Sequence, residues 1–116
     1  MSQTYDIMRQ RRGDTFAGVI FIYTLNASPI SLVGASIKMQ VRSEADATDY
    51  IMQFTTGASE ITIGGAGNNE VTILPKQVPP TAPAKKCVYD VEITFPDTTV
   101  KTWVTGIFEI LKDVTR

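Results

Sequence analysis

The chain has 116 residues, of which 43% are hydrophobic and 20% are charged, and its formal net charge is −1. This length and balance are typical of a globular protein with one domain, spanning residues 1–116. The near-neutral charge gives no electrostatic footprint for nucleic acid or an anionic membrane, so we expect neither as a partner. The lone cysteine, Cys87, excludes an internal disulfide, and its place in an alternating segment predicts a buried thiol.

The N-terminal segment has no apolar core of the kind found in signal peptides, so we expect synthesis in a cytosol without export. The longest apolar run is also far below the ~20 residues of a membrane span. Residues 3–9 predict a short first strand, with Tyr5 and Ile7 on one face. Arg9, Arg11 and Arg12 follow as a basic cluster, which is either a solvated turn or a docking contact for an acidic partner.

Residues 14–25 are the most apolar segment and predict a strand, because β-branched and aromatic residues dominate it. Apolar residues occupy both faces, so the strand is either central and covered twice, or its outer face meets a neighbour. Residues 35–43 alternate cleanly, with Ile37, Met39 and Val41 predicted to face the core. Residues 43–49 predict a loop or one helical turn, and residues 50–54 predict a short strand.

Residues 60–74 predict a hairpin that pairs Ile61 and Ile63 with Val71 and Ile73 across a glycine-rich turn. A phosphate-binding loop would need a helix after the glycines, and a strand follows here instead. The proline-rich residues 75–85 cannot form a central strand, since proline donates no ladder hydrogen bond. They predict a crossover between sheets, with a proline-rich docking segment as the alternative.

Residues 86–111 predict two long strands joined by a tight turn at residues 96–98. In the second strand, Val100, Val104, Phe108 and Ile110 share one face, which leaves Trp103, Ile107 and Leu111 on the opposite one. Three interpretations of this apolar stripe stay open: a loop such as residues 75–85 covers it, a bulge at Gly106 shifts the register, or it contacts another subunit. The strands together, about seven, predict an all-β sandwich or barrel.

Catalytic chemistry finds little support in the sequence. There is no histidine, which removes histidine-dependent triads and the commonest general base and metal ligand. Asp90 and Glu92 lie on one strand face about 7 Å apart, where a solvated surface is the simpler interpretation and a hard cation or sugar the alternative. We therefore expect no enzyme, no cofactor and no bound metal, and we expect no small-molecule ligand.

Two groups of residues resemble a known family. The first lies near the N-terminus: Asp6, Ile7, residues 12–16, Pro29, Ile30, Leu32, Gly34, Ala35, Ile37, Met39, Val41 and Arg42. The second lies near the C-terminus: residues 88–93, residues 100–104, Gly106, Phe108, Ile110 and residues 113–116. The chain is similar in these positions to the N-terminal, Ig-like domain of the baseplate upper protein family of tailed bacteriophages, with residues 43–85 the least similar part.

The resemblance implies an Ig-like β-sandwich of about seven antiparallel strands with a structural role in a phage or prophage particle. It implies other phage structural proteins and copies of the chain itself as partners, and the virion as location after synthesis in the bacterial host cytoplasm. The chain ends at Arg116 without a helical stalk or receptor-binding module, so we expect an accessory protein or small adaptor. The candidate interface comprises Trp103, Ile107, Leu111, Arg9, Arg11 and Arg12. A small carbohydrate-binding module, stacking sugars on Trp103 or Tyr50, is the alternative function.

Overall fold

The computed structural model describes residues 3–25 and 28–112, and every regular element within these ranges is a β-strand. Six strands form the larger sheet: β1 (Gln3–Thr4), β2 (Ile7–Arg11), β7 (Ser36–Arg42), β8 (Met52–Thr55), β12 (Lys86–Thr94) and β13 (Val100–Leu111). Its order is β1-β13-β12-β7-β8, and β2 continues along the same edge of β13 as β1. Both of these N-terminal strands run parallel to β13, whereas the other pairs are antiparallel. The prediction of an all-β protein is therefore confirmed for the described residues.

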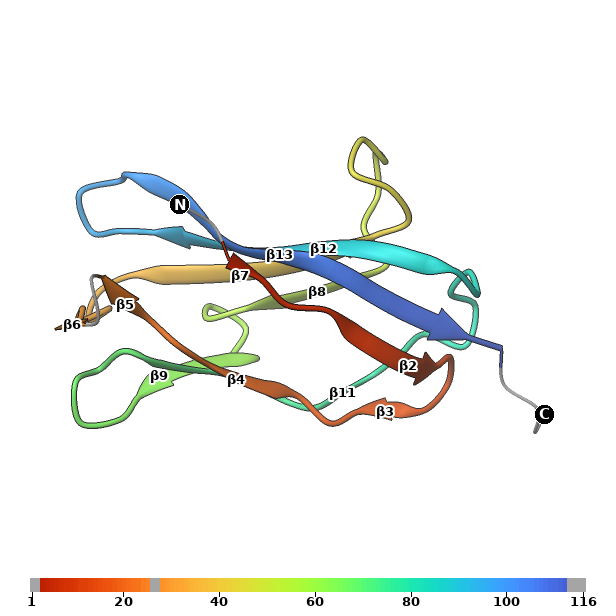
Figure 1. The fold of residues 1–116 in the computed structure, drawn as a ribbon, viewed down its shortest axis with the longest axis horizontal. Helices are drawn as coiled ribbons and strands as arrows, with labels where there is room; N and C mark the ends of the chain where they lie inside the picture. The colour runs from red at the N-terminus through yellow and green to blue at the C-terminus, as the bar shows by residue number, and fades with distance from the viewer. Residues whose placement is uncertain (1–2, 26–27, 113–116) are drawn as a thin grey trace.

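Three smaller sheets complete the fold. The largest of them has the order β4-β10-β9, built from β4 (Val19–Ile22), β10 (Glu70–Ile73) and β9 (Ile61–Gly64). The other two are short pairs: β3 (Thr15–Phe16) with β11 (Lys76–Gln77), and β5 (Thr24–Leu25) with β6 (Ser28–Pro29). Figure 1 shows the larger sheet as one layer and β4, β9, β3 and β11 as a second layer beneath it. The buried side chains of both layers form one hydrophobic cluster.

Alternation along the central strands explains how they bury one face. In β7, Ile37, Met39 and Val41 are buried, as the sequence predicted, while the residues between them reach the surface. In β12, alternate residues are buried in the same way, starting from the Cys87 thiol. Burial raises the pKa of this thiol, an effect that nearby Lys85 partly offsets. Cys87 is therefore a core residue, as predicted.

The long apolar segment of residues 14–25 does not form one continuous strand. Gly18 separates β3 from β4 and adopts φ +88°. Glycine is required here because this φ disfavours other residues and because a Cβ would overlap the carbonyl oxygen of Ile73. The break switches the faces, so that Phe16 is buried whereas Ile20 and Ile22 are exposed. The alternative of a central strand covered on both sides is wrong, since Ile20 and Ile22 are exposed and β10 is the one described strand that pairs with β4. The alternative of an outer face that meets a neighbour stays a prediction.

The two hairpins have the predicted partners. Ile63 lies opposite Val71, and Ile61 lies opposite Ile73, in the β9–β10 hairpin. The β12–β13 hairpin turns at residues 95–99, where Thr98 adopts φ +73° and its N–H donates to the Phe95 carbonyl. Residues 75–85 cross from the β4-β10-β9 sheet to the larger sheet, as predicted. Within this segment, β11 is the part that pairs with another described strand, β3. Residues 43–49 form a loop without a helical turn.

Candidate docking surfaces

The structure buries Trp103 instead of exposing it in an outward stripe. Val91 lies opposite Val104 and Glu92 lies opposite Thr102, so Trp103 is the extra residue of a β-bulge. The bulge turns its side chain inward, where it is 2% exposed and contacts the rings of Phe21 and Tyr23 edge-on, with centroids 5.6 and 5.2 Å away. The predicted outward position of Trp103 is therefore wrong. Neither residues 75–85 nor another subunit is needed to explain its burial, and the shift in register lies at Trp103 itself and not at Gly106.

Gly106 marks a close approach of two segments. A Cβ on Gly106 would overlap the carbonyl of Tyr5 and lie 3.0 Å from Cε1 of Tyr89. The chain bends between β1 and β2 at this point, and the Tyr89 hydroxyl donates a hydrogen bond to the Tyr5 carbonyl oxygen. The Tyr5 N–H donates to the Thr105 carbonyl, and the Ile107 N–H donates to the Asp6 carboxylate. These bonds fix the N-terminal strands along the edge of β13.

The Tyr89 hydroxyl makes stability depend on alkaline pH. Burial, and then the neighbouring Tyr5 and Asp6, raise the pKa of Tyr89 above its ordinary value. The unfolded chain loses this proton near pH 10 and the folded chain holds it, so the stabilisation is complete below about pH 10 and declines above it. We expect Tyr89→Phe to reduce this decline and to cost about 1–2 kcal/mol at neutral pH, because the Tyr5 carbonyl loses its donor.

Urea unfolding between pH 7 and pH 11 measures both effects. Tyr50→Phe is the matched control, since Tyr50 is 49% exposed in the described structure. It should keep the wild-type decline, because it leaves the Tyr89 hydroxyl and its bond to the Tyr5 carbonyl in place. Equal pH profiles for the two variants would contradict the role assigned to Tyr89.

The remaining residues of the candidate interface lie near the C-terminal end of β13. Arg9 and Arg11 are exposed on β2, Arg12 follows it, and Ile107 and Leu111 are half-buried. The Arg9 N–H donates to the Glu109 carboxylate, while the Arg11 and Arg12 guanidinium groups donate to the carbonyls of Lys112 and Ala82. The structure therefore gives these arginines contacts within the chain. Their contact with an acidic partner stays a prediction.

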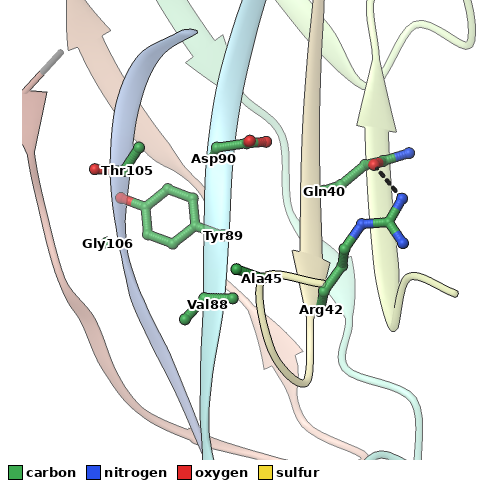
Figure 2. Close-up of a pocket in the computed structure, with 8 residues that line it drawn as sticks. All are labelled: Gln40, Arg42, Ala45, Val88, Tyr89, Asp90, Thr105 and Gly106. Atoms are coloured by element: carbon green, nitrogen blue, oxygen red, sulfur yellow. Dashed lines mark hydrogen bonds between the residues drawn. The ribbon is translucent and has the colours of Figure 1, made fainter. Parts of the chain in front are cut away.

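A hollow of about 370 Å³ lies on the outer face of the larger sheet. Figure 2 shows its lining side chains, which come from β7, β12, β13 and the loop after β7: Gln40, Arg42, Ala45, Val88, Tyr89, Asp90, Thr105 and Gly106. Arg42 donates to the Gln40 side chain and to the Ala47 carbonyl, both at 2.8 Å, and Gln40 donates to Gln53 at 2.6 Å. The side chains of Arg42 and Gln40 are thus already hydrogen-bonded within the protein.

Asp90 is the acidic group of this hollow. It stands opposite Thr105 on one side and Gln40 on the other, with its side chain on the outer face. Burial, and then the Glu92 carboxylate, raise the pKa of Asp90, while Arg42 and Lys38 partly offset the effect. The pair Asp90 and Glu92 predicted from the sequence does share one face. Within the described ranges, no cluster of three or more acidic or cysteine side chains suits a metal ion.

The β4-β10-β9 sheet presents apolar side chains to solvent. Ile20 and Ile22 are 58% and 50% exposed on the outer face of β4. Tyr5 and Met8, which are 50% and 41% exposed, lie beside this strand. Tyr5 contacts the ring of Phe21 edge-on, and Tyr5 and Met8 line a groove of about 290 Å³ with Gly18 and Val19. The surface formed by Tyr5, Met8, Ile20 and Ile22 is called the β4 surface below.

Sequence reasoning placed these residues in strands but did not recognise the β4 surface. The signal was present, because residues 19–25 are apolar on both faces and only one face can point into a two-layer core.

The alternative function, a carbohydrate-binding module, named Trp103 and Tyr50 as the rings that stack on sugar. Trp103 is buried and cannot do so, which leaves Tyr50 as the exposed ring of the two.

Comparison of the sequence with protein-family models and with curated proteins found no match. Among residues 3–25 and 28–112, no helix has the length and apolar character needed to cross a membrane.

Proposed function

We propose that this protein is a non-catalytic structural or adaptor component of a tailed bacteriophage or prophage particle, and that it acts by docking to other proteins. Its partners would be copies of itself and other structural proteins of the tail or baseplate. The proposal rests on the resemblance of both ends of the chain to an N-terminal domain of baseplate proteins. The β4 surface is the observation that favours docking, because its four apolar side chains are all at least 41% exposed, and exposed apolar surface marks protein interaction sites.

The strand order supports an Ig-like sandwich as the finer description of the fold. In Ig domains of the variable type, strands G, F, C and C′ form one sheet and strands B, E and D belong to the other. When the strands are lettered in chain order with β4 as strand B, the order β13-β12-β7-β8 corresponds to G-F-C-C′. The order β4-β10-β9 corresponds to B-E-D. The disulfide found in antibody domains has no counterpart, since the chain contains one cysteine. The sheets instead meet through apolar side chains such as Phe21 and Trp103.

Particle association tests this function directly. Tailed particles would be banded on a density gradient from a lysate of the bacterium that carries the coding sequence. An antibody against the recombinant protein would then be used to probe each fraction. We expect the protein to band with intact particles at a constant ratio to the major tail protein. Detection only in the unassembled fraction would contradict the proposal.

A further inference from the structure

We propose that the free edge of β4 pairs with the same edge of a second copy of this chain, in an antiparallel arrangement with a two-fold axis at Phe21. This inference rests on the proposed docking function and names one partner for it. The β4-β10-β9 sheet of one copy would then join the same sheet of its partner into one continuous sheet across the axis. The first reason is the hydrogen bonding of β4.

The main-chain groups of Ile20 and Ile22 point away from β10. The Tyr23 N–H donates to the Asn69 carbonyl at 2.8 Å, so Tyr23 and Asn69 form a hydrogen-bonded pair. Such pairs alternate with non-bonded ones in an antiparallel ladder, which makes Phe21 opposite Val71 the next bonded pair. The N–H and C=O groups of Ile20 and Ile22 therefore face the free edge. No described strand pairs with that edge.

A two-fold axis at Phe21 matches these groups with their own copies. It places Ile20 of one protomer opposite Ile22 of its partner, and each residue offers the other a donor and an acceptor. The same residues carry the exposed side chains of β4, so the isoleucines of both copies become neighbours on the outer face. An axis at Ile20 or Ile22 would instead pair one of the isoleucines with Gly18 or Thr24. The arrangement is isologous, as in most dimers.

The β8 and β2 edges of the larger sheet carry features that oppose pairing. Native proteins protect edges with charges, bulges and covering side chains. Along β8, Lys76 donates to the Gln53 carbonyl and to the Glu60 carboxylate at 2.5 Å each, and Glu60 also accepts the Thr55 N–H. The β2 edge has a bulge at Arg9, whose φ is +59°, and this residue is charged.

The β4 edge carries no charged side chain, and this lack of charge suits an identical partner. Residues 15–25 contain no charged side chain, so two copies can align without repulsion between like charges. Tyr5 and Met8 lie beside the strand and would extend the contact. Even so, two short strands form an interface near the lower end of the usual range, about 1,200 Å². We therefore expect a weak dimer.

Molar mass in solution, measured by light scattering up to about 1 mM protein, tests the pairing. The wild type should approach twice the mass of one chain as concentration rises. Ile20→Lys and Ile22→Lys should stay monomeric, because each places a charge in the paired face. Thr62→Lys is the matched control on β9, where Thr62 is also exposed on the outer face, and should dimerise like the wild type. Circular dichroism would check that each variant is folded.

Cysteine cross-linking tests the register. A mixture of Ile20→Cys and Ile22→Cys proteins should form a disulfide between the two variants, because paired Cα atoms lie about 5.5 Å apart. Ile20→Cys protein alone should not, since its cysteines are diagonal neighbours at about 7–8 Å. The buried Cys87 does not interfere. Cross-linking of Ile20→Cys alone, without the mixed product, would overturn the axis at Phe21.

The outcomes separate this inference from the proposed function. A wild-type monomer at every concentration, or a dimer unchanged by Ile20→Lys and Ile22→Lys, overturns the self-pairing. If such a protein still bands with tailed particles, the structural role stands and β4 does not mediate it. If the β4 dimer forms but the protein never bands with particles, the self-pairing stands and the phage role fails.

Discussion

Gly106→Ala is expected to lower the free energy of unfolding by about 2–4 kcal/mol, because it forces overpacking and breaks a partly buried hydrogen bond. The added Cβ would overlap the Tyr5 carbonyl, which is main chain and cannot swing aside as a long side chain can. Relief requires the β1–β2 bend to move away from β13. That movement separates the Tyr89 hydroxyl from its acceptor and disturbs the contact between Tyr5 and Phe21.

Urea unfolding followed by circular dichroism measures this change, and Gly64→Ala provides a matched control. Gly64 is also a strand residue, at the end of β9, but a Cβ there meets no atom within 4 Å. Replacing glycine in a strand by alanine reduces the entropy of the unfolded chain, so Gly64→Ala should be neutral or slightly stabilising. Similar losses in the two variants would show that the close approach at Tyr5 is not what requires Gly106.

Alternation was the part of the fold that the sequence predicted well. Strands β7 and β12 are central in the larger sheet, and each residue in them faces either the core or the outer surface. Their inward residues could therefore be read by counting in steps of two. The β9–β10 hairpin was equally predictable, since its glycine and asparagine turn leaves few possible registers for Ile61, Ile63, Val71 and Ile73.

The errors came from places where alternation is interrupted. A bulge at Trp103 adds one residue to β13, and Gly18 turns the chain between β3 and β4. Each interruption exchanges inward and outward positions for the residues beyond it. At the first, Trp103 is buried and Val100 is exposed, the reverse of the prediction. Beyond the second, Ile20 and Ile22 no longer share a face with the buried Phe16. Both depend on contacts with distant segments, at Val91 and at Ile73, which no local pattern contains.

The outward position predicted for Trp103 was wrong for the same reason. The sequence drew attention to an apolar stripe on β13, whereas Ile20 and Ile22 are exposed on β4, and Tyr5 and Met8 are exposed on the N-terminal segment. Position in a sheet decides this difference: β13 is flanked by β12 and by β1 and β2, while β4 has one neighbour among the strands that the structure describes. Edge strands cannot be identified from a single sequence without knowing the strand order. An apolar run on both faces was the available sign.

Trp103→Ala is expected to destabilise the folded chain by about 3–5 kcal/mol, the usual cost of truncating a buried tryptophan. The indole lies between the layers and touches Phe21 and Tyr23, whose rings would face a cavity after its removal. A surface contact with another subunit predicts a different result, namely lost self-association with nearly unchanged stability. Urea unfolding followed by circular dichroism, together with molar mass at a concentration where the protein is folded, separates the two.

Trp103→Phe keeps the measurement interpretable if the alanine variant does not fold. Phenylalanine retains edge contacts with the neighbouring rings and should lose less stability than alanine, while leaving dimer formation through β4 intact. Val100→Ala is the matched surface control, because Val100 lies on the same strand and is 55% exposed. Its effect should stay within about 0.5 kcal/mol of the wild type. A Trp103→Ala protein as stable as the Val100→Ala protein would contradict the inward position of the indole and the bulge that produces it.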